Sequence, residues 1–141
     1  MIITCGSFVV DSSGRLLLCR VTGTCHGWGV PKGLPNKNED YLSAAKRELI
    51  EETGIDIDMF PHKMCELGES ICTYKKKTIV GFLFLVDGVI DQKLFCKSTF
   101  FDSFAGIDVP EVDKYMWVDI HKALNVISKA QVELVIKCLK N

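Results

Sequence analysis

Three glutamates, Glu48, Glu51 and Glu52, lie close together in the sequence with the spacing i, i+3 and i+4. On an α-helix this spacing projects all three carboxylates from one face, where they repel one another. One interpretation is a solvated acidic face. The other is a site for a divalent cation such as Mg²⁺, which takes oxygen ligands and keeps substrate phosphates in its coordination shell.

The segment before these glutamates favours the cation. Residues 22–38 are rich in glycine and proline, so they predict a loop that brings backbone groups close to a ligand. The carboxylates also lie toward the C-terminal end of the expected helix, where the helix dipole disfavours negative charge. The sequence therefore predicts that this loop and helix together hold a metal-bound diphosphate.

The helix that positions the glutamates is expected over Asp40–Thr53. Asp40 is a suitable N-cap, acidic residues are expected in the first turn, and Gly54 is typical of the residue that ends a helix. Helical spacing predicts a core-facing stripe. Its members are Leu42, Ala45, Leu49 and Thr53.

The remaining pattern predicts a mixed sheet flanked by helices, an α/β (α+β) arrangement. The expected strands are Ile2–Val10, Arg15–Val21, Lys63–Tyr74, Thr78–Val86, Gln92–Thr99 and Tyr115–Val118, with a short strand near Trp28. Phe100–Glu111 is expected to be a loop, and Asp119–Asn125 a helical turn. A second helix is expected over Ser128–Leu139, with Ser128 and Gln131 as a capping box. Its expected apolar stripe is Val132, Val135, Ile136 and Leu139.

The segment from Gly33 to Ile55 resembles the Nudix box, G-x5-E-x7-R-E-U-x-E-E-x-G-U, in which U is apolar. Every position agrees. The fixed residues are Gly33, Glu39, Arg47, Glu48, Glu51, Glu52 and Gly54, and the apolar ones are Leu49 and Ile55. The resemblance implies a hydrolase that splits the pyrophosphate of a nucleoside diphosphate linked to another group. It also implies a Nudix-type α/β/α sandwich with a mixed β-sheet.

The same resemblance implies roles for the box residues. Glu51 and Glu52 correspond to the principal metal ligands, and Glu48 to a further ligand or the general base. Arg47 belongs with this catalytic group and is expected to orient a glutamate through a charge-assisted hydrogen bond. The backbone carbonyl of Lys32 matches another metal-ligand position. The implied cofactor is Mg²⁺, with Mn²⁺ as an alternative.

Family members often add one carboxylate from a later loop. The candidates here are Asp102, Asp108, Glu111 and Asp113. We favour Glu111 because it lies six residues before Trp117, as in hydrolases of diadenosine polyphosphates. A surface acid without a metal role is the alternative interpretation. Glu39 is expected to fix the junction between the loop and the helix.

The approach to the box, W-G-V-P-K-G over residues 28–33, indicates the substrate class. It resembles the W-x-x-P-K-G segment of diadenosine polyphosphate hydrolases, diphosphoinositol polyphosphate phosphohydrolases and messenger-RNA decapping enzymes. Lysines bind polyphosphate as point charges, and aromatic rings stack on bases. The expected substrate-binding residues are Trp28, Lys32, Gly33, Tyr74, Lys76 and Lys77. A solvated turn for residues 75–77 and a place in the core or at its rim for the aromatic residues are the plainer alternatives.

The leading hypothesis is therefore hydrolysis of dinucleoside polyphosphates or similar nucleotide-type substrates. Two other enzyme hypotheses are pyrophosphohydrolysis of capped or triphosphorylated RNA 5′ ends and cleavage of non-standard nucleoside triphosphates. A non-catalytic nucleotide sensor on the same fold is disfavoured, because such proteins usually lose box glutamates and all are present here.

Composition sets broader bounds. The 141 residues suit one domain, 1–141, with a sizeable core, and the net charge of −1 gives no global attraction to nucleic acid or to anionic membranes. The seven cysteines include no C-x-x-C pair, which favours buried thiols over a zinc site or a disulfide framework. The first residues lack a signal-peptide pattern, and the longest apolar run is too short for a membrane span. We expect a cytoplasmic monomer or homodimer.

Overall fold

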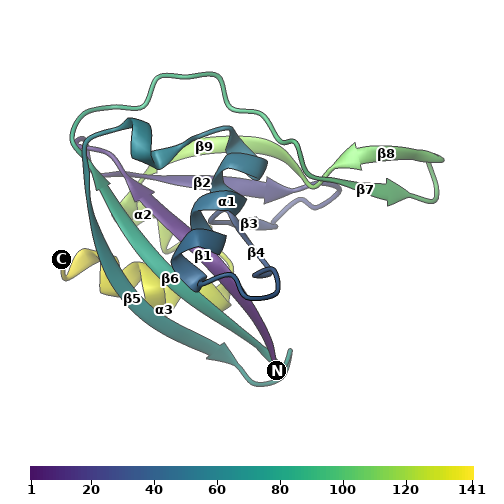
Figure 1. The fold of residues 1–141 in the computed structure, drawn as a ribbon, viewed down its shortest axis with the longest axis horizontal. Helices are drawn as coiled ribbons and strands as arrows, with labels where there is room; N and C mark the ends of the chain where they lie inside the picture. Colours follow the sequence, from purple (N-terminus) through teal and green to yellow (C-terminus); the bar gives the residue numbers. More distant parts are fainter.

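A computed structural model describes residues 1–141 and contains a seven-stranded mixed sheet with helices on both faces (Figure 1). The strands of this sheet are β1 (Ile2–Val10), β2 (Arg15–Val21), β3 (Trp28–Gly29), β4 (Lys32–Gly33), β5 (His62–Cys72), β6 (Lys77–Val86) and β9 (Val112–Asp119). The helices are α1 (Tyr41–Thr53), a 3₁₀ turn η1 (Ile57–Met59), α2 (Ile120–Ala123) and α3 (Lys129–Leu139). The expected fold class is confirmed.

Strand β1 is the centre of the sheet, whose main order is β3-β2-β1-β6-β5, with β4 on β1 and β9 on β2. It runs parallel to β6 and antiparallel to β2 and β4. Its side chains alternate between two cores: Phe8 packs with α2 and α3, whereas Cys5 and Val9 pack beneath α1. The alternation of a strand thus fixes α1 on one face and the C-terminal helices on the other.

Helix α1 begins and ends close to the expected residues. The side chain of Asp40 accepts a hydrogen bond from the Ser43 amide at 2.7 Å, and Gly54 ends the helix with φ of 80°. The expectation of an acidic first turn is wrong, because the acids Glu39 and Asp40 precede the helix. Ala45 and Leu49 are fully buried, so the core stripe of α1 is as expected there.

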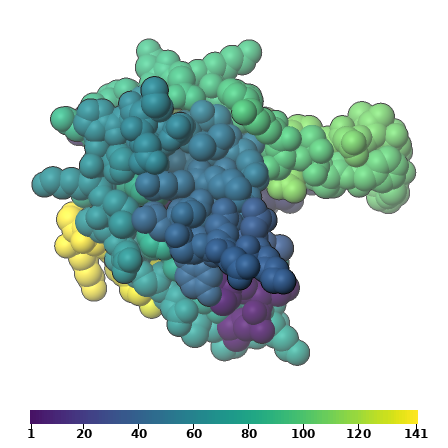
Figure 2. Space-filling model, in the orientation of Figure 1, coloured from purple at the N-terminus to yellow at the C-terminus, as the bar shows by residue number.

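The largest error concerns residues 92–111. Residues 92–98 form no strand, and the expected loop Phe100–Glu111 instead contains the hairpin β7 (Thr99–Asp102) and β8 (Ile107–Pro110). Asp102 accepts hydrogen bonds from the amides of Phe104 and Ala105, and Gly106 has φ of 70°, so a tight turn closes the hairpin. The two strands pair only with each other and project from the body (Figures 1 and 2). Residues 99–110 are called the arm below.

Two expectations for the C-terminal helix are also wrong. Ser128 precedes α3 but makes no side-chain cap, and the side chain of Gln131 accepts a hydrogen bond from the Val30 amide at 2.9 Å instead. The buried residues of α3 are Gln131, Leu134, Val135 and Cys138, whereas Ile136 and Leu139 are exposed. The buried stripe of α3 is therefore shifted by one residue from the expected stripe, because the Gln131 side chain points inward and accepts the Val30 hydrogen bond. No helix in the structure is long and apolar enough to cross a membrane.

Candidate active site

Helix α1 packs on the sheet through the face that carries Ala45 and Leu49, and its carboxylates flank this face. Ser7 on β1 donates a hydrogen bond to the carbonyl of Ala45 at 2.9 Å, and Leu49 is fully buried in the core beneath the helix. Glu48 and Glu52 are nevertheless mostly buried, because the loop containing β4 covers them, while Glu51 is more exposed. The sequence thus places charged side chains in a partly desolvated site on a rigid element.

Arg47 is the central cation of this site. Its guanidinium binds both carboxylate oxygens of Glu39, with the Nε–Oε2 distance at 2.9 Å, and it donates to the carbonyl of Leu34 at 2.8 Å. Its Nη1 also contacts Glu48 at 2.9 Å and Glu51 at 3.1 Å. Glu39 in turn accepts a hydrogen bond from the Asn36 amide at 2.9 Å. Arg47 and Glu39 therefore tie the loop to the helix.

Glu52 has different partners. Its Oε1 accepts a hydrogen bond from the Lys32 amide at 2.8 Å, and its backbone carbonyl accepts one from the Tyr115 hydroxyl. Burial raises the pKa of Glu52 to about 8, although the Lys32 hydrogen bond opposes this shift. Burial likewise raises the pKa of Glu48, against the effect of Arg47. A cation bound near these two carboxylates would therefore lower their pKa values and favour their charged forms.

Gly33 lies directly beneath the carboxylate of Glu48. A Cβ added at position 33 would overlap the carboxylate carbon and both oxygens. Glycine at position 33 therefore leaves room for this carboxylate where Arg47 holds it, and a larger residue would force the Glu48 side chain to move.

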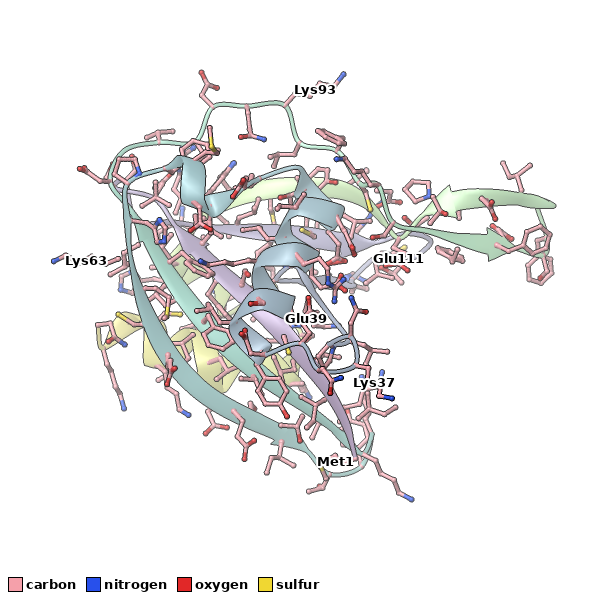
Figure 3. The ribbon with its side chains drawn as sticks, in the orientation of Figure 1. Met1, Lys37, Glu39, Lys63, Lys93 and Glu111 are labelled. Atoms are coloured by element: carbon pink, nitrogen blue, oxygen red, sulfur yellow. The ribbon has the colours of Figure 1, made fainter.

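Among the later acids, Glu111 is the one that the structure brings toward the site. Its charge contributes to the raised pKa of both Glu48 and Glu52, and Figure 3 shows it on the side of α1 where the arm begins. Asp113 is instead paired with Arg20, with 3.1 Å between the Asp113 carboxylate and the Arg20 Nε. Asp102 and Asp108 lie on the arm, away from the helix.

A pocket of about 240 Å³ opens beside Glu52 on the α3 side of the sheet. Trp28, Val30, Ile79 and Val112 contribute apolar surface to its lining. Three lysines also line it, namely Lys32, Lys75 and Lys77. The pocket thus combines an apolar interior and a cationic wall next to a carboxylate of α1.

The expected substrate-binding residues divide into two groups. Trp28, Lys32 and Lys77 line the pocket, and Gly33 lies under Glu48. Tyr74 and Lys76 do not line it. Lys76 has φ of 52° in the turn before β6, and Tyr74 is 79% exposed.

Three residues that sequence reasoning did not single out for this site also lie here. Lys75 takes the place expected for Lys76, since the turn directs it into the pocket lining. Gln131 reaches the pocket from α3, and Tyr115 reaches Glu52 from β9. The run of three lysines at residues 75–77 indicated that Lys75 could bind phosphate. Nothing in the sequence indicated a role at this site for Gln131 or Tyr115, which lie far from the box.

The donor set fits a hard divalent cation. The groups facing one another are carboxylates and backbone groups, without a histidine or thiol pair that would select zinc. No three His, Cys, Asp or Glu side chains form a preformed metal cluster, because Arg47 holds Glu48 and Glu51 while Lys32 holds Glu52. Cation binding would therefore redirect carboxylates that are already close together.

Comparison with known proteins identifies the family. The model of the NUDIX domain matches residues 3–136. The chain belongs to the Nudix family. It is a Nudix pyrophosphohydrolase, an enzyme that acts on pyrophosphate bonds, and the family generally uses a divalent metal such as Mg²⁺.

Individual relatives of this Nudix chain are distant. It is 25% identical over 129 residues to an RNA pyrophosphohydrolase of Pelagibacter ubique, covering 86% of this chain and 78% of that one. The fold is similar to an Ap4A hydrolase of C. elegans, with a TM-score of 0.72, 18% identity and coverage of 97% and 96%. It is also similar to a MutT protein of Methanosarcina mazei, with a TM-score of 0.69, 19% identity and coverage of 99% and 93%. These likenesses show the fold but leave the substrate open.

Proposed function

We propose that this Nudix hydrolase splits dinucleoside polyphosphates in a reaction that requires Mg²⁺. The observation that carries the proposal is that Glu52 and the lysines Lys32, Lys75 and Lys77 line one pocket together with Trp28. The apolar interior suits one nucleoside, and the lysines suit a chain of several phosphates beside the carboxylates. A second nucleoside would extend from the far end of that chain toward solvent.

The nucleoside half of the pocket has a defined polar group. Gln131 is buried and uses its Oε1 to accept the Val30 hydrogen bond, so its Nε2 is left to donate to a ligand. Gly29 lies against that amide group, since an added Cβ would be 2.7 Å from Nε2. Trp28 offers a ring on which a base can stack. These groups would bind one base through stacking and one hydrogen bond.

The phosphate half depends on local charge. The net charge of the chain is −1, so its general field does not attract a polyanion. The three lysines of the pocket would reduce the repulsion between the phosphate chain and an approaching nucleophile. They would also stabilise the negative charge that develops on the departing phosphate.

We assign the hydrolytic step to the carboxylate face of α1. An oxygen of water attacks one phosphorus, a new P–O bond forms, and the bridging P–O bond to the departing phosphate breaks. Glu51 and Glu52 would hold Mg²⁺ with help from Glu111 and the Lys32 carbonyl, and the bound ion would polarise phosphate oxygens and acidify water. Glu48 either completes this ligand set or accepts the proton of the attacking water. Arg47 orients Glu48 and Glu51 through the contacts described above.

Two alternative substrates have a specific observation in their favour. The Pelagibacter ubique relative is an RNA pyrophosphohydrolase, and its similarity covers 86% of this chain, which favours RNA 5′ ends. The similar fold of the E. coli dihydroneopterin triphosphate pyrophosphohydrolase favours cleavage of a triphosphate. The three lysines in one pocket lead us to rank the dinucleoside polyphosphates first.

A substrate panel with Mg²⁺ tests the proposal. Diadenosine tetraphosphate, a triphosphorylated RNA oligonucleotide and a set of nucleoside triphosphates are compared by kcat/KM, with products resolved by ion-exchange chromatography. We expect the dinucleotide to give two mononucleotides and the highest kcat/KM, and Glu52→Gln to abolish its turnover. A higher kcat/KM for the RNA or for a triphosphate, with release of pyrophosphate, would overturn the choice of substrate.

A further inference from the structure

The arm, residues 99–110, is held to the body at its base, where the Thr22 hydroxyl donates to the Pro110 carbonyl at 2.6 Å. Its two strands form a separate two-stranded sheet, and Figures 1 and 2 show it projecting from the body. A two-stranded hairpin is marginally stable in water unless it packs against something else. Phe101 and Ile107 are 64% and 59% exposed, and Phe104 at the turn is fully exposed. Such a group of exposed apolar side chains marks an interaction surface.

The charge of the arm excludes a polyanionic partner. It contains Asp102 and Asp108 and neither lysine nor arginine. Nucleic acid and anionic lipid surfaces are bound through basic residues, so an acidic arm would repel both. The partner should instead present apolar groups with positive charge around them.

The chain itself carries a surface of that kind at the turn between β5 and β6. The lysine tip consists of Ile2, Ile71, Tyr74, Lys75 and Lys76. Ile2, Ile71 and Tyr74 are exposed to 50%, 53% and 79%. The Ile2 amide donates to the Lys76 carbonyl at 2.9 Å, which ties the N-terminus to the turn, while Ile71, in register with Thr78, lies on the opposite face of the sheet from Ile2. The tip is thus apolar and basic, whereas the arm is apolar and acidic.

We propose that two copies of this chain form a two-fold dimer in which the arm of each copy docks on the lysine tip of the other. Within one copy the arm points away from the body, and the tip lies beside the N-terminus at another corner (Figure 1). One two-fold axis repeats the contact, so each copy uses both surfaces and neither is left open. Opposite charges at the rim fix the orientation, and the phenylalanines of the arm supply the apolar contact.

The dimer contact would also border the catalytic pocket. The tip borders the pocket through Lys75, and Cys72 beside it also lines that pocket. The arm of the partner copy would therefore lie along the pocket rim, where its aspartates would compete with substrate phosphates for Lys75. The arm is joined to Glu111 in its own chain, whose carbonyl accepts a hydrogen bond from Thr22 at 3.0 Å. Dimer formation would thus restrain the segment that carries Glu111.

Sedimentation equilibrium of the full chain tests this proposal without any assay of activity. We expect a concentration-dependent dimer, and we expect Phe101→Ser with Phe104→Ser to raise its dissociation constant at least about tenfold, as for the loss of a hot spot. Met59→Ser is the matched control, since Met59 is 77% exposed on η1, outside both surfaces. A circular-dichroism melting curve for each variant verifies that the body remains folded. A monomeric wild-type chain, or a dimer insensitive to the arm variants, would overturn the proposal.

Charge reversal tests which surface the arm contacts. Ser103→Lys with Asp108→Lys makes both surfaces of a copy basic and keeps Asp102, which closes the turn of the arm, and Lys75→Glu with Lys76→Glu makes both acidic. Each variant alone should be monomeric, whereas an equimolar mixture should form a heterodimer. If the mixture does not restore the dimer, the lysine tip is not the docking surface and an unrelated partner or another patch covers the arm.

Discussion

The backbone of Gly33 lies so close to the Glu48 carboxylate that any side chain at position 33 would occupy the same space. Glu48 is mostly buried there and also bound by Arg47 at 2.9 Å. The loop and helix of the box thus depend on each other, because the loop leaves room for the carboxylate and the carboxylate fills the space over the loop.

Gly33→Ala should therefore reduce catalysis more than stability. The methyl group would displace the Glu48 carboxylate, and a shift of about 1 Å in a catalytic group costs on the order of 100-fold in rate. We expect kcat to fall by about that factor, with KM nearly unchanged and the melting temperature close to wild type.

The matched control for this variant is Gly14→Ala in the β1–β2 turn. No atom lies within 4 Å of an added Cβ at position 14, but its φ of 77° disfavours alanine. This control should lose about 1 kcal/mol of stability through backbone strain and retain its kcat. Wild-type kcat in Gly33→Ala would show that the position of Glu48 is not critical.

Arg47→Lys should reduce activity although it keeps the positive charge. Lysine cannot reproduce the forked contact with Glu39 while also reaching Glu48 and Glu51. We expect kcat/KM to fall about 10- to 100-fold, as for other residues that orient metal ligands. Steady-state kinetics over a range of Mg²⁺ concentrations measures this, with Lys46→Arg on the outer face of α1 as the control. An activity equal to that of the control would argue against the orienting role.

The stability of the metal-free protein should fall as pH rises from about 4.5 to about 8. Burial raises the pKa of Glu52 from 4.5 to about 8, so the folded chain holds a proton that the unfolded chain has already released in this window. Rising pH therefore favours unfolding until Glu52 is ionised in both states. The raised pKa of Glu48 acts in the same direction.

Urea unfolding in the presence of a chelator measures this dependence. We expect a loss on the order of a few kcal/mol across the window, at about 1.4 kcal/mol per pKa unit. Glu52→Gln should flatten the curve, and added Mg²⁺ should restore stability mainly above neutral pH. A wild-type stability that rises over the same window would contradict the burial effect on Glu52.

Gln131→Glu should alter base recognition and lower stability, because the new carboxylate is buried. The substituted side chain still offers an oxygen to the Val30 amide, but it replaces the Nε2 donor with an acceptor. We expect KM for a substrate whose base accepts from Nε2 to rise about tenfold or more, with kcat little changed, since leaving one buried hydrogen-bonding group unpaired costs about 1–3 kcal/mol. Kinetics with adenine-, guanine- and uracil-containing substrates measures this. Equal KM values for wild type and variant on all of them would place the base elsewhere.

The carboxylate helix could be predicted from sequence because each of its signals is local. Asp40, Gly54 and the buried face with Leu49 lie within one short segment, and their effects do not depend on the rest of the chain. The same holds for Arg47 and its three glutamates, because Glu48 and Glu51 follow it by one and four residues on the same helix and Glu39 lies eight residues earlier, just before the helix.

The arm and the pocket could not be predicted because they depend on distant contacts. The arm lacks a core that would impose a clear alternation, so Phe100 and Val109 pair across a hairpin with exposed side chains on both faces. Gln131 left the expected capping box because Val30, about a hundred positions earlier, offers a buried amide. Lys75 rather than Lys76 faces the pocket because the turn gives Lys76 a left-handed backbone.

Isothermal titration of Mn²⁺ and Mg²⁺ into the chain, with a non-hydrolysable dinucleotide present, tests the metal site most directly. We expect the wild type to bind the ions, and Glu51→Gln and Glu52→Gln to lose most of that binding while keeping a wild-type circular-dichroism spectrum. Lys46→Gln, on the same helix but paired with Asp58, should bind as the wild type does. Equal binding by the wild type and both glutamate variants, or no binding by any of them, would contradict a metal site on the carboxylates of α1.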